Sequence, residues 1–507
     1  MGTGLAFAKE GAPVARTRHG EVRGYLDDGI KVFKGVPYGA DTATRRFLPP
    51  APPEPWQGVR EATAYGLASP QTHAGEAIGE DCLKLNVWTP GLRDGARRPV
   101  MFYIHGGEYS HGSGSAELYD GARLCRRGDV VVVTVNHRLA AVGHLYLGKI
   151  AGPEYAASGN VGILDLILAL RWVRDNIAEF GGDPSRVMVF GQSGGGAKIA
   201  TMTGIPLAKG LFHRAITMSG QQVTASGPLG ATERAKAYLA ALKLAPEQWP
   251  QLKTLPIERL VEAMDAPDPN IHKSGIYWGP VLDNAVIHRH AFYPDAARIM
   301  PEVPLIIGNT HDETRYFFRN EPGLFSLTWD ALPARLGPEM RTDIDPDFVV
   351  AEYRRLYPNY SPTDVFFAAS TAARSWRGAV IEQEVRAASG LPVQAYQVNW
   401  RSLLDGGKWG APHTIDIPLA FDNTDKPAAA SGDGPAARAM AEVVSETFIA
   451  FARTGDPANP KLPAWPVYEL DKRSTMIFDL PPHVEDDPRA AERRLFAQVP
   501  WVQRGTF

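Results

Sequence analysis

Residues 187–198 read Val187-Met188-Val189-Phe190-Gly191-Gln192-Ser193-Gly194-Gly195-Gly196-Ala197-Lys198. The four apolar residues predict a buried strand, and the small residues after Ser193 predict a helix from Ala197 to Thr203. Gly-x-Ser-x-Gly between a strand and a helix is typical of a nucleophile elbow, a sharp turn that exposes the serine hydroxyl. Gly191 and Gly195 lack side chains, so the two elements can pack closely around it. The stretch therefore predicts a catalytic serine at position 193.

Two other interpretations of this stretch are weaker. Glycine and serine are common in ordinary turns, but the flanking strand and helix favour the elbow. The spacing of Gly191 and Gly196 nearly fits a phosphate-binding loop, which needs a lysine where Ala197 stands. Lys198 comes one residue late, so we reject the phosphate-binding interpretation.

A serine hydroxyl needs a general base, and the base needs a carboxylate to orient it. In α/β-hydrolases the acid and then the histidine follow the serine, each in a loop after a strand. Glu313 follows the predicted strand Leu305–Gly308, with Asp312 beside it as the alternative acid. His413 follows the predicted strand Val393–Trp400 and is the expected base.

The other histidines are weaker candidates for the base or for a metal site. His105, His137 and His311 fall in the wrong order or place for the base. His288 and His290 could lie on one face of a strand, but no nearby cysteine or carboxylate completes a metal site. The sequence therefore predicts no metal and no cofactor.

The loop His105-Gly106-Gly107-Glu108 follows the predicted strand Val100–His105 and resembles the His-Gly-Gly motif of an oxyanion hole. Such a hole needs backbone N–H groups aimed where negative charge develops. Gly194, directly after the nucleophile, supplies one of these groups, and the glycine-rich loop is expected to supply the others.

Apolar runs alternate with helical segments along the chain, which predicts an α/β fold with a mostly parallel, twisted central sheet. No composition break looks like a linker, so residues 9–507 are expected to form one domain with helical insertions. An amphipathic helix is expected over Asn160–Phe180, where Leu164, Leu168, Arg171, Trp172 and Asp175 recur at helical spacing. Further elements are expected at 13–36 (edge hairpins), Glu80–Trp88, Val130–Val135, Ala215–Ser219, 226–270, 322–385, 435–454 and Thr475–Asp479.

Composition argues against several classes of function. The 507 residues are 44% hydrophobic and 21% charged, with a net charge of −3, so nothing draws the chain strongly to nucleic acid or to an anionic membrane. No run of 18 apolar residues occurs, so no membrane-spanning helix is expected. A small molecule is the expected partner, and the sequence favours no particular oligomeric state.

The first residues end in Ala6-Phe7-Ala8, the small-x-small pattern of a signal-peptidase site. The charged and apolar regions that should precede this pattern are missing. Residues 1–8 are therefore interpreted as the remnant of an export signal, which would place the protein in the periplasm or outside the cell. The alternative is a plain flexible start on a cytoplasmic protein.

Together these motifs resemble the type-B carboxylesterases, the family of bacterial para-nitrobenzyl esterases, animal carboxylesterases and cholinesterases. The resemblance runs from about Gly20 to Asp479 and implies an α/β-hydrolase fold with a catalytic triad. It rests on the elbow, Asp312-Glu313 and the segments Phe33–Tyr38, Glu80–Trp88, Tyr103–Gly107, Asn160–Asp165 and Phe180–Pro184.

The resemblance also implies roles for individual residues. The triad would be Ser193, Glu313 and His413, and the oxyanion donors Gly107, Glu108 and Gly194, with Gly106 shaping the turn. Trp278 and Trp376 match positions that line the acyl or gorge region in relatives. Structural ion pairs are implied for Glu80 with Arg46 and for Asp165 with Arg138, and Cys82, which has no upstream partner, would be a free buried thiol.

Three residues depart from the usual family pattern. Gln192 replaces a glutamate beside the nucleophile, which weakens the expected attraction for cationic esters. Gly194 replaces an alanine, and Glu108 stands where glycine or alanine is usual, so its carboxylate would repel an oxyanion unless it is turned away.

We expect two-step hydrolysis of small to medium apolar or aryl esters through an acyl-enzyme, in a pocket that includes Gln192, Trp278 and Trp376. The alternatives are the same triad acting on an amide, carbamate or lactone, and a catalytically silent cholinesterase-like binding protein.

Overall fold

The computed structural model describes residues 11–72 and 74–506, so the segment 1–8 that was interpreted as an export remnant lies outside the described residues. Its central sheet contains β3 (Tyr25–Asp27), β4 (Ile30–Pro37), β6 (Lys84–Thr89), β7 (Arg98–Ile104), β8 (Val131–Val135), β9 (Gly182–Gln192), β10 (Arg214–Met218), β11 (Leu305–Thr310), β12 (Val393–Val398), β13 (Ser474–Phe478) and β14 (His483–Asp486).

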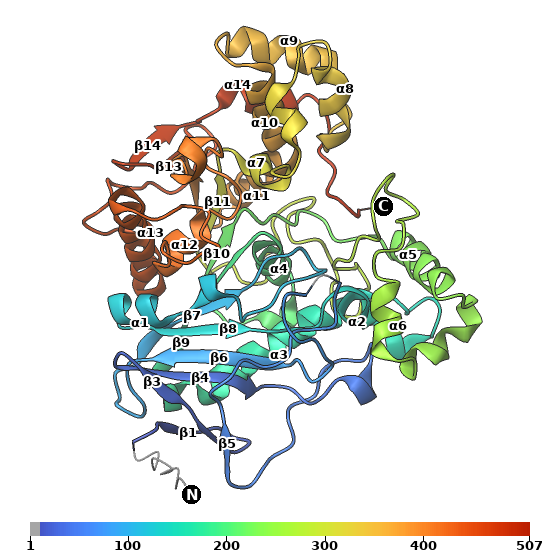
Figure 1. Cartoon of the computed structure of the whole chain (residues 1–507), viewed down its shortest axis with the longest axis vertical. Helices are drawn as coiled ribbons and strands as arrows, with labels where there is room; N and C mark the ends of the chain where they lie inside the picture. The colour runs from blue at the N-terminus through green and yellow to red at the C-terminus, as the bar shows by residue number, and fades with distance from the viewer. Residues whose placement is uncertain (1–10, 73, 507) are drawn as a thin grey trace, which may run out of the picture.

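The order across this sheet is β14-β13-β12-β11-β10-β9-β7-β8-β6-β4-β3, and it can be followed in Figure 1. Neighbouring strands from β13 to β8 are parallel. The strands β14, β6, β4 and β3 join antiparallel at the two ends. The mostly parallel sheet that the sequence predicts is therefore confirmed.

The hairpins expected within residues 13–36 occur in two places. One is β3–β4 at the edge of the central sheet. The other joins β1 (Val14–Arg16) and β2 (Glu21–Arg23), which pair with β5 (Val59–Glu61) in a small separate sheet.

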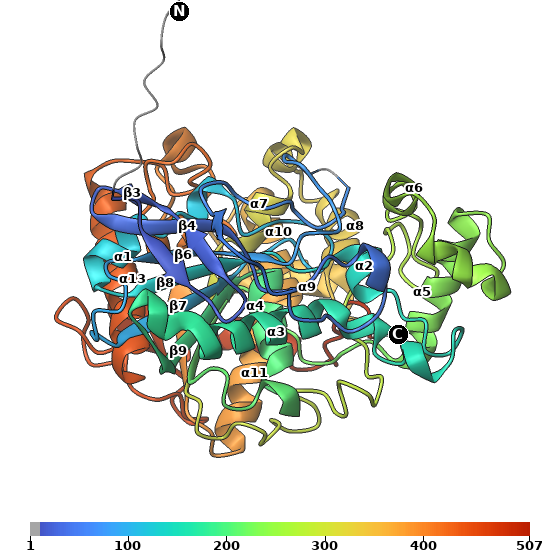
Figure 2. The ribbon, with the colours of Figure 1, turned by 90° about the horizontal axis from the view of Figure 1, so that it is seen from below.

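Alternate residues of the central strands enter two different hydrophobic cores. On β7, Val100, Phe102 and Ile104 face the first core, whereas Met101 and Tyr103 face the second. Burial on both faces explains why these strands read as continuous apolar runs. The first core is covered by α3 (Val161–Asn176), α4 (Gly194–Met202) and α11 (Arg377–Ala388), and the second by α1 (Ala122–Gly128), α12 (Asp416–Phe421) and α13 (Pro435–Thr454); Figure 2 shows α1 and α13 together at one side of the sheet.

The helix expected over Asn160–Phe180 is formed by α3 and the 3₁₀ turn η5 (Ile177–Phe180). Leu164 and Leu168 are partly buried and pack against the first core, while Ile163 and Leu170 are fully buried. A helix that is packed on most of its surface has apolar residues on several faces, so the spacing of apolar residues does not show which face is most deeply buried.

The longer helical segment Pro153–Phe180 is long and apolar enough to cross a membrane by length and composition alone. However, 72% of its most apolar window is buried inside the protein. Its hydrophobicity is used in the core of the fold.

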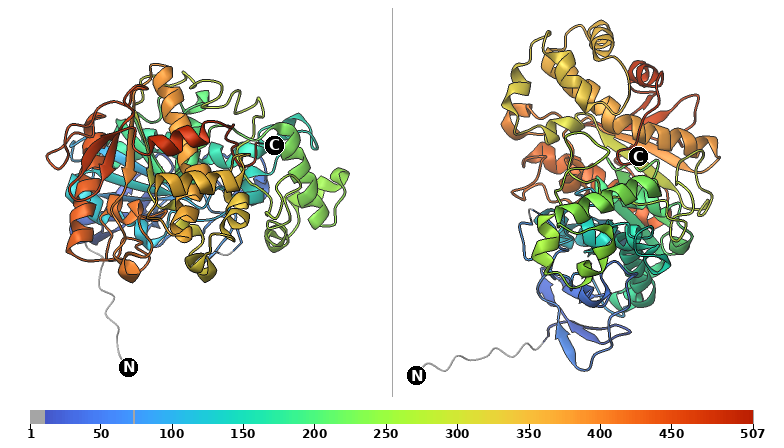
Figure 3. Two further views of the ribbon diagram at one scale, coloured as in Figure 1. Left: turned by 90° about the horizontal axis from the view of Figure 1, so that it is seen from above. Right: turned by 90° about the vertical axis from the view of Figure 1, so that its right-hand side faces the viewer.

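Two helical insertions stand away from the sheet, as the sequence predicts. Residues 226–270 contain α5 (Pro228–Ala241), η7 (Pro246–Lys253) and α6 (Ile257–Glu262). The second insertion contains α7 (Glu313–Phe317), α8 (Leu332–Leu336), α9 (Pro346–Leu356) and α10 (Pro362–Thr371), and the last three of these helices share a separate hydrophobic cluster. Figures 1 and 3 show these insertions as two separate lobes, green and yellow.

The strand expected at Glu80–Trp88 begins only at Lys84. Its first residues form a loop, in which the Glu80 carboxylate accepts two hydrogen bonds of 2.6 Å from the Arg46 guanidinium. Cys82 and Cys125 are both free and buried, as expected for Cys82. Burial raises the pKa of the Cys82 thiol to about 12.

The second ion pair implied by the resemblance lies deep in the core. The Arg138 guanidinium donates to both carboxylate oxygens of Asp165, at 2.7 and 2.9 Å, and the Arg138 backbone N–H donates to the same carboxylate at 2.9 Å. Both side chains are at most 1% exposed. The pair joins the segment after β8 to helix α3.

Replacing one member of this pair should destabilise the fold strongly. Asp165→Asn leaves a buried guanidinium without its counter-charge, which typically costs about 3–5 kcal/mol. Equilibrium unfolding in guanidinium chloride measures the change. Asp433→Asn is the matched control, because its partner Arg438 is 64% exposed and a screened surface pair contributes little. Equal losses in the two variants would contradict the prediction.

Candidate active site

Ser193 lies between the carboxyl end of β9 and the start of α4. Its φ of 56° and ψ of −126° are unusual for a residue with a side chain, as a nucleophile elbow requires. A Cβ atom on Gly195 would lie 1.9 Å from the Ile104 carbonyl oxygen, and one on Gly220 would lie 2.0 Å from the Ser193 carbonyl oxygen. Only glycine fits at either position, so the turn depends on close backbone contact.

The elbow lies where the strand order of the sheet reverses. Strands β7 and β9 are neighbours, but β8 lies on the far side of β7 and β10 on the far side of β9. The loops that leave β7 and β9 therefore diverge and leave a crevice at the carboxyl ends of the strands, the usual ligand site in open α/β sheets. Gly106, Gly107 and Glu108 follow β7 and Ser193 follows β9, so they meet at this crevice.

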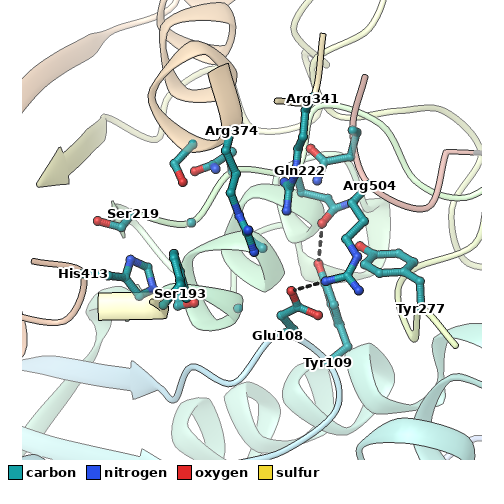
Figure 4. Close-up of a pocket in the computed structure, with 17 residues that line it drawn as sticks. Glu108, Tyr109, Ser193, Ser219, Gln222, Tyr277, Arg341, Arg374, His413 and Arg504 are labelled. Atoms are coloured by element: carbon teal, nitrogen blue, oxygen red, sulfur yellow. Dashed lines mark hydrogen bonds and ion pairs between the residues drawn. The ribbon is translucent and has the colours of Figure 1, made fainter. Parts of the chain in front are cut away.

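The structure brings His413 and Glu313 together, although a hundred residues separate the two in the sequence. His413 also lies beside Ser193 in the pocket (Figure 4). Nδ1 of His413 hydrogen-bonds Oε2 of Glu313, and both residues are buried. The other Glu313 oxygen accepts from the Thr310 backbone N–H at 2.9 Å and from the Asn309 amide at 3.2 Å. Burial alone would raise the pKa of Glu313, but the charge and hydrogen bond of His413 outweigh it and lower the pKa.

Gln192 contacts the other nitrogen of the same imidazole. Nε2 of His413 lies 3.0 Å from the side-chain nitrogen of Gln192, so that amide donates to it. With the Nδ1 proton directed to Glu313, the single lone pair of Nε2 accepts from the Gln192 amide, so this amide has to move aside before Nε2 can take the Ser193 proton. Gln192 is therefore a second anchor for the ring, and the pocket at Ser193 is lined by other residues.

The alternative acid, Asp312, has a different set of partners. Its carboxylate accepts from the Ala411 backbone N–H at 2.9 Å and pairs with His311 at 3.3 Å and Arg315 at 3.6 Å. Asp312 thereby fixes the loop that positions His413. The geometry favours Glu313 as the orienting carboxylate.

The remaining candidate histidines have structural contacts. The rings of His105 and His137 stack at 4.8 Å, and each Nδ1 hydrogen-bonds a neighbouring backbone carbonyl. Burial lowers the pKa of His105 to about 3, so it is neutral. Nδ1 of His290 accepts from the Ala225 backbone N–H at 3.0 Å.

The loop after β7 lies directly against the elbow. Gly107 and Glu108 have φ values of 87° and 53°. A Cβ atom on Gly194 would lie only 2.1 Å from the Glu108 carbonyl oxygen. The alanine usual in the family at this position would therefore push the loop away, which gives a steric reason for glycine at 194.

Lys198, one turn into α4, contacts the backbone carbonyl groups of this loop. Its ammonium nitrogen lies 2.6 Å from the Glu108 carbonyl oxygen and 3.4 Å from that of His105. The side chain is fully buried. Burial lowers the pKa of Lys198 to about 7, against the opposing charge of Glu108.

The Glu108 carboxylate is turned towards arginines. It pairs with Arg504 at 3.0 Å, as the dashed line in Figure 4 marks. Burial would raise the pKa of Glu108, but Arg504 first, and then Arg341 and Arg374, outweigh it and lower the pKa. The repulsion expected from a carboxylate in the oxyanion loop is thus offset by neighbouring cations.

The pocket at Ser193 differs from the one that the sequence predicts. Its wall includes Tyr109, Tyr277, Phe317, Arg341, Arg374 and Arg504.

The two tryptophans expected in this wall lie elsewhere. Trp278 packs edge-on against Tyr238 at 5.5 Å, and Trp376 lies under Arg489 at 4.6 Å. Each directly follows a residue that does line the pocket, Tyr277 or Ser375, and the side chains of such neighbours point in different directions. We therefore drop both tryptophans as substrate contacts. No motif marked the three arginines in the sequence.

Comparison with known proteins places this architecture in a family. The sequence profile of the carboxylesterase family matches residues 11–355. The chain is 34% identical to the para-nitrobenzyl esterase of Bacillus subtilis over 501 residues, which cover 95% of this chain and 98% of that protein. It is also 34% identical to the phenmedipham hydrolase of Pseudarthrobacter oxydans, over 92% of this chain and 94% of that protein.

Solved structures agree with this assignment. A carboxylesterase of Geobacillus stearothermophilus superposes with a TM-score of 0.83 at 36% identity, over 95% of this chain and 99% of the other. A para-nitrobenzyl (PNB) esterase superposes with a TM-score of 0.80 at 32% identity, with the same coverage. The chain therefore belongs to the carboxylesterase family and is a carboxylic ester hydrolase with the α/β-hydrolase fold.

Proposed function

We propose that this hydrolase cleaves esters through an acyl-enzyme, with Ser193 as nucleophile, His413 as general base and Glu313 as the carboxylate that orients the imidazole. The observation that supports this most directly is the contact between Nδ1 of His413 and the buried Glu313 carboxylate, in the pocket that Ser193 lines. This order of donor and acceptor leaves Nε2 of His413 as the proton-accepting atom.

In the first step the Ser193 hydroxyl oxygen attacks the ester carbonyl carbon while Nε2 of His413 takes the hydroxyl proton. The tetrahedral intermediate expels the alcohol, which receives that proton, and the acyl group stays on Ser193. Water then attacks the acyl carbonyl as His413 takes a proton from it. The bond between the acyl carbon and the Ser193 oxygen breaks, the Ser193 oxygen takes that proton back from His413, and the carboxylic acid leaves. Each step needs the same base in the same tautomer.

The negative charge of each tetrahedral intermediate would be stabilised by the backbone N–H groups of Gly107, Glu108 and Gly194. This assignment is supported by the close packing of the loop after β7 against the elbow. Lys198 supports the loop through the carbonyl groups of Glu108 and His105. It is proposed as a positioning residue.

The aromatic side chains Tyr109, Tyr277 and Phe317 in the pocket wall suit small to medium esters with apolar or aryl parts. Hydrolysis of an amide, carbamate or lactone by the same triad is the second candidate, because all of these proceed through the same tetrahedral chemistry. A panel of acyl 4-nitrophenyl esters and matched anilides separates the two candidates.

Removing the nucleophile should abolish turnover while the fold survives. Ser193→Ala is expected to lower kcat for 4-nitrophenyl butyrate by a factor of roughly 10⁴ or more. A fluorophosphonate probe should label the wild type covalently and leave this variant unlabelled. An unchanged thermal transition controls for folding, and retained turnover or labelling would refute the assignment of Ser193.

The two candidate acids should differ in their effect on catalysis. Glu313→Gln removes the charge that stabilises the imidazolium and should lower kcat by roughly 10⁴. Asp312→Asn is the matched control, since it alters the neighbouring carboxylate and leaves the His413 contact in place, and a much smaller loss is expected. The reverse order of these losses, measured with one ester at one pH, would assign the role to Asp312.

The buried Lys198 should make stability depend on pH in a characteristic direction. Its pKa of about 7 in the folded protein lies below the usual 10.5, so between these values the unfolded chain binds a proton that the folded chain lacks. The free energy of unfolding should therefore rise with pH in this window, by up to about 1.4 kcal/mol per pH unit.

Lys198→Met should remove this contribution to the pH dependence, and the exposed Lys236→Met should leave it in place. Chemical unfolding of the wild type and the two variants at pH 7, 8 and 9 gives, for each protein, the slope of the free energy of unfolding against pH. If the free energy of unfolding changes with pH equally in the wild type and in Lys198→Met, Lys198 does not titrate in this range.

A further inference from the structure

Three arginines from distant parts of the chain converge in the pocket at Ser193. Arg341 follows the lobe helix α8, Arg374 lies between α10 and α11, and Arg504 lies in the C-terminal segment. Figure 4 shows the three side chains gathered on one side of the pocket, across from His413. The expected pocket of apolar and aryl character does not account for them.

Arg374 is presented by an unusual piece of backbone. Residues Ala372–Trp376 form a π-helical turn between α10 and α11. Such wide turns occur mostly as single insertions in α-helices, frequently at functional sites. The Arg374 guanidinium stacks over the ring of Phe317, another pocket residue, at 4.8 Å.

Arg341 and Arg504 are fixed to each other through paired backbone. Thr342 and Trp501 form a β-bridge, and the Val502 N–H donates to the Arg341 carbonyl oxygen at 3.0 Å. The C-terminal segment is held further by the Trp501 indole, which donates to the Ala373 carbonyl oxygen at 2.9 Å. The three arginines therefore belong to one connected wall.

The same segment is anchored on its other side. The Ser226 hydroxyl donates to the Gly505 carbonyl oxygen at 2.6 Å, and the Gly227 N–H donates to the Thr506 carbonyl oxygen at 3.1 Å. The C-terminal residues thus connect the two helical lobes. Arg504 is held in the pocket by this connection.

The charges in the pocket do not balance. Among the described residues that line it, the only carboxylate is Glu108, which pairs with Arg504 at 3.0 Å. Arg374 pairs with Glu339 at 3.4 Å, but Glu339 also forms a shorter ion pair, of 2.8 Å, with Arg335. Within residues 11–72 and 74–506, Arg341 forms no ion pair. The wall therefore has positive charge that the protein does not neutralise.

The titration of Arg341 agrees with this imbalance. Burial, and then the charges of Arg374 and Arg504, lower the pKa of its guanidinium to about 9. The group is still protonated at neutral pH. A bound anion would relieve the repulsion among the three cations.

We propose that the pocket selects esters that bear a free carboxylate, with Arg341 as the principal contact and Arg374 and Arg504 as its supporting cations. The proposal rests on the triad mechanism given above and specifies the substrate class for the same site. A planar guanidinium can bind a carboxylate through two parallel hydrogen bonds, which gives it directional preference as well as charge. The same wall disfavours cationic esters.

The carboxylate can come from either half of the substrate. It belongs to the acyl half in a monoester of a dicarboxylic acid, and to the leaving group in an ester of a hydroxy acid. Mono-4-nitrophenyl glutarate tests the first source against neutral 4-nitrophenyl pentanoate. The acetate ester of 4-hydroxybenzoate tests the second source against phenyl acetate.

The wild type should hydrolyse at least one carboxylate ester with a kcat/KM about tenfold or more above that of its neutral partner. Arg341→Gln should reduce this ratio about tenfold, Arg374→Gln should reduce it less, and Arg341→Lys should retain part of it. Arg438→Gln, which removes an equal charge from an exposed surface position, should leave the ratio unchanged. The KM of the preferred carboxylate ester should rise with salt, while that of its neutral partner should not.

These outcomes distinguish a failure of the carboxylate preference from a failure of the proposed triad mechanism. If neutral esters are cleaved in a Ser193-dependent way but both ratios stay near one or below, the carboxylate preference is refuted and the triad stands. A preference that survives both Arg341→Gln and Arg374→Gln also refutes it. If Ser193→Ala matches the wild type, the proposed mechanism itself fails. Thermal transitions of the arginine variants show that any change in ratio comes from folded protein.

Discussion

The backbone of the nucleophile turn lies in van der Waals contact with the backbone that leaves β7. A Cβ atom on Gly195 would meet the Ile104 carbonyl at 1.9 Å, and one on Gly194 would meet the Glu108 carbonyl at 2.1 Å. This contact fixes the nucleophile and the expected oxyanion donors relative to each other. Because both segments leave neighbouring parallel strands, the sheet itself maintains their separation.

Around this contact the protein buries several groups that would be charged in water. Glu313 keeps its charge because His413, the Thr310 backbone N–H and the Asn309 amide contact its carboxylate, so its pKa is lowered in spite of burial. Lys198 has only carbonyl oxygens as hydrogen-bond partners, and burial lowers its pKa to about 7. The histidines under the loop are held neutral. The site thus combines two paired carboxylates, Glu313 and Glu108, with weakly supported cations, and the cations favour developing negative charge.

The three departures from the family pattern have physical explanations in this fold. Gly194 leaves room for the Glu108 carbonyl, which Lys198 holds. The Glu108 side chain is paired with Arg504 instead of facing the crevice unopposed. The uncharged amide of Gln192 can donate to His413, which a glutamate carboxylate could not do. These substitutions are therefore compatible with the proposed arrangement of nucleophile, base and acid, and they change the charge of the surrounding wall.

The sequence by itself determined the class of fold, and it predicted the elbow and the order of serine, acid and histidine. These features depend on local patterns: apolar strands, a glycine-rich turn, and polar residues directly after strands. It left Glu313 and Asp312 as alternatives. Only the tertiary structure separated them, because adjacent residues at the end of β11 point to different partners.

The pocket wall was decided by tertiary structure alone. Trp278 and Trp376 matched family positions, but a shift of one residue along an irregular segment turns a side chain from the pocket into the core. Arg504 lies beyond the motifs on which the resemblance rests, and its place in the pocket follows from the β-bridge between Trp501 and Thr342, which lies 159 positions earlier (501 − 342). Local sequence does not encode such long-range pairings, which form only when the lobes and the C-terminal segment pack together.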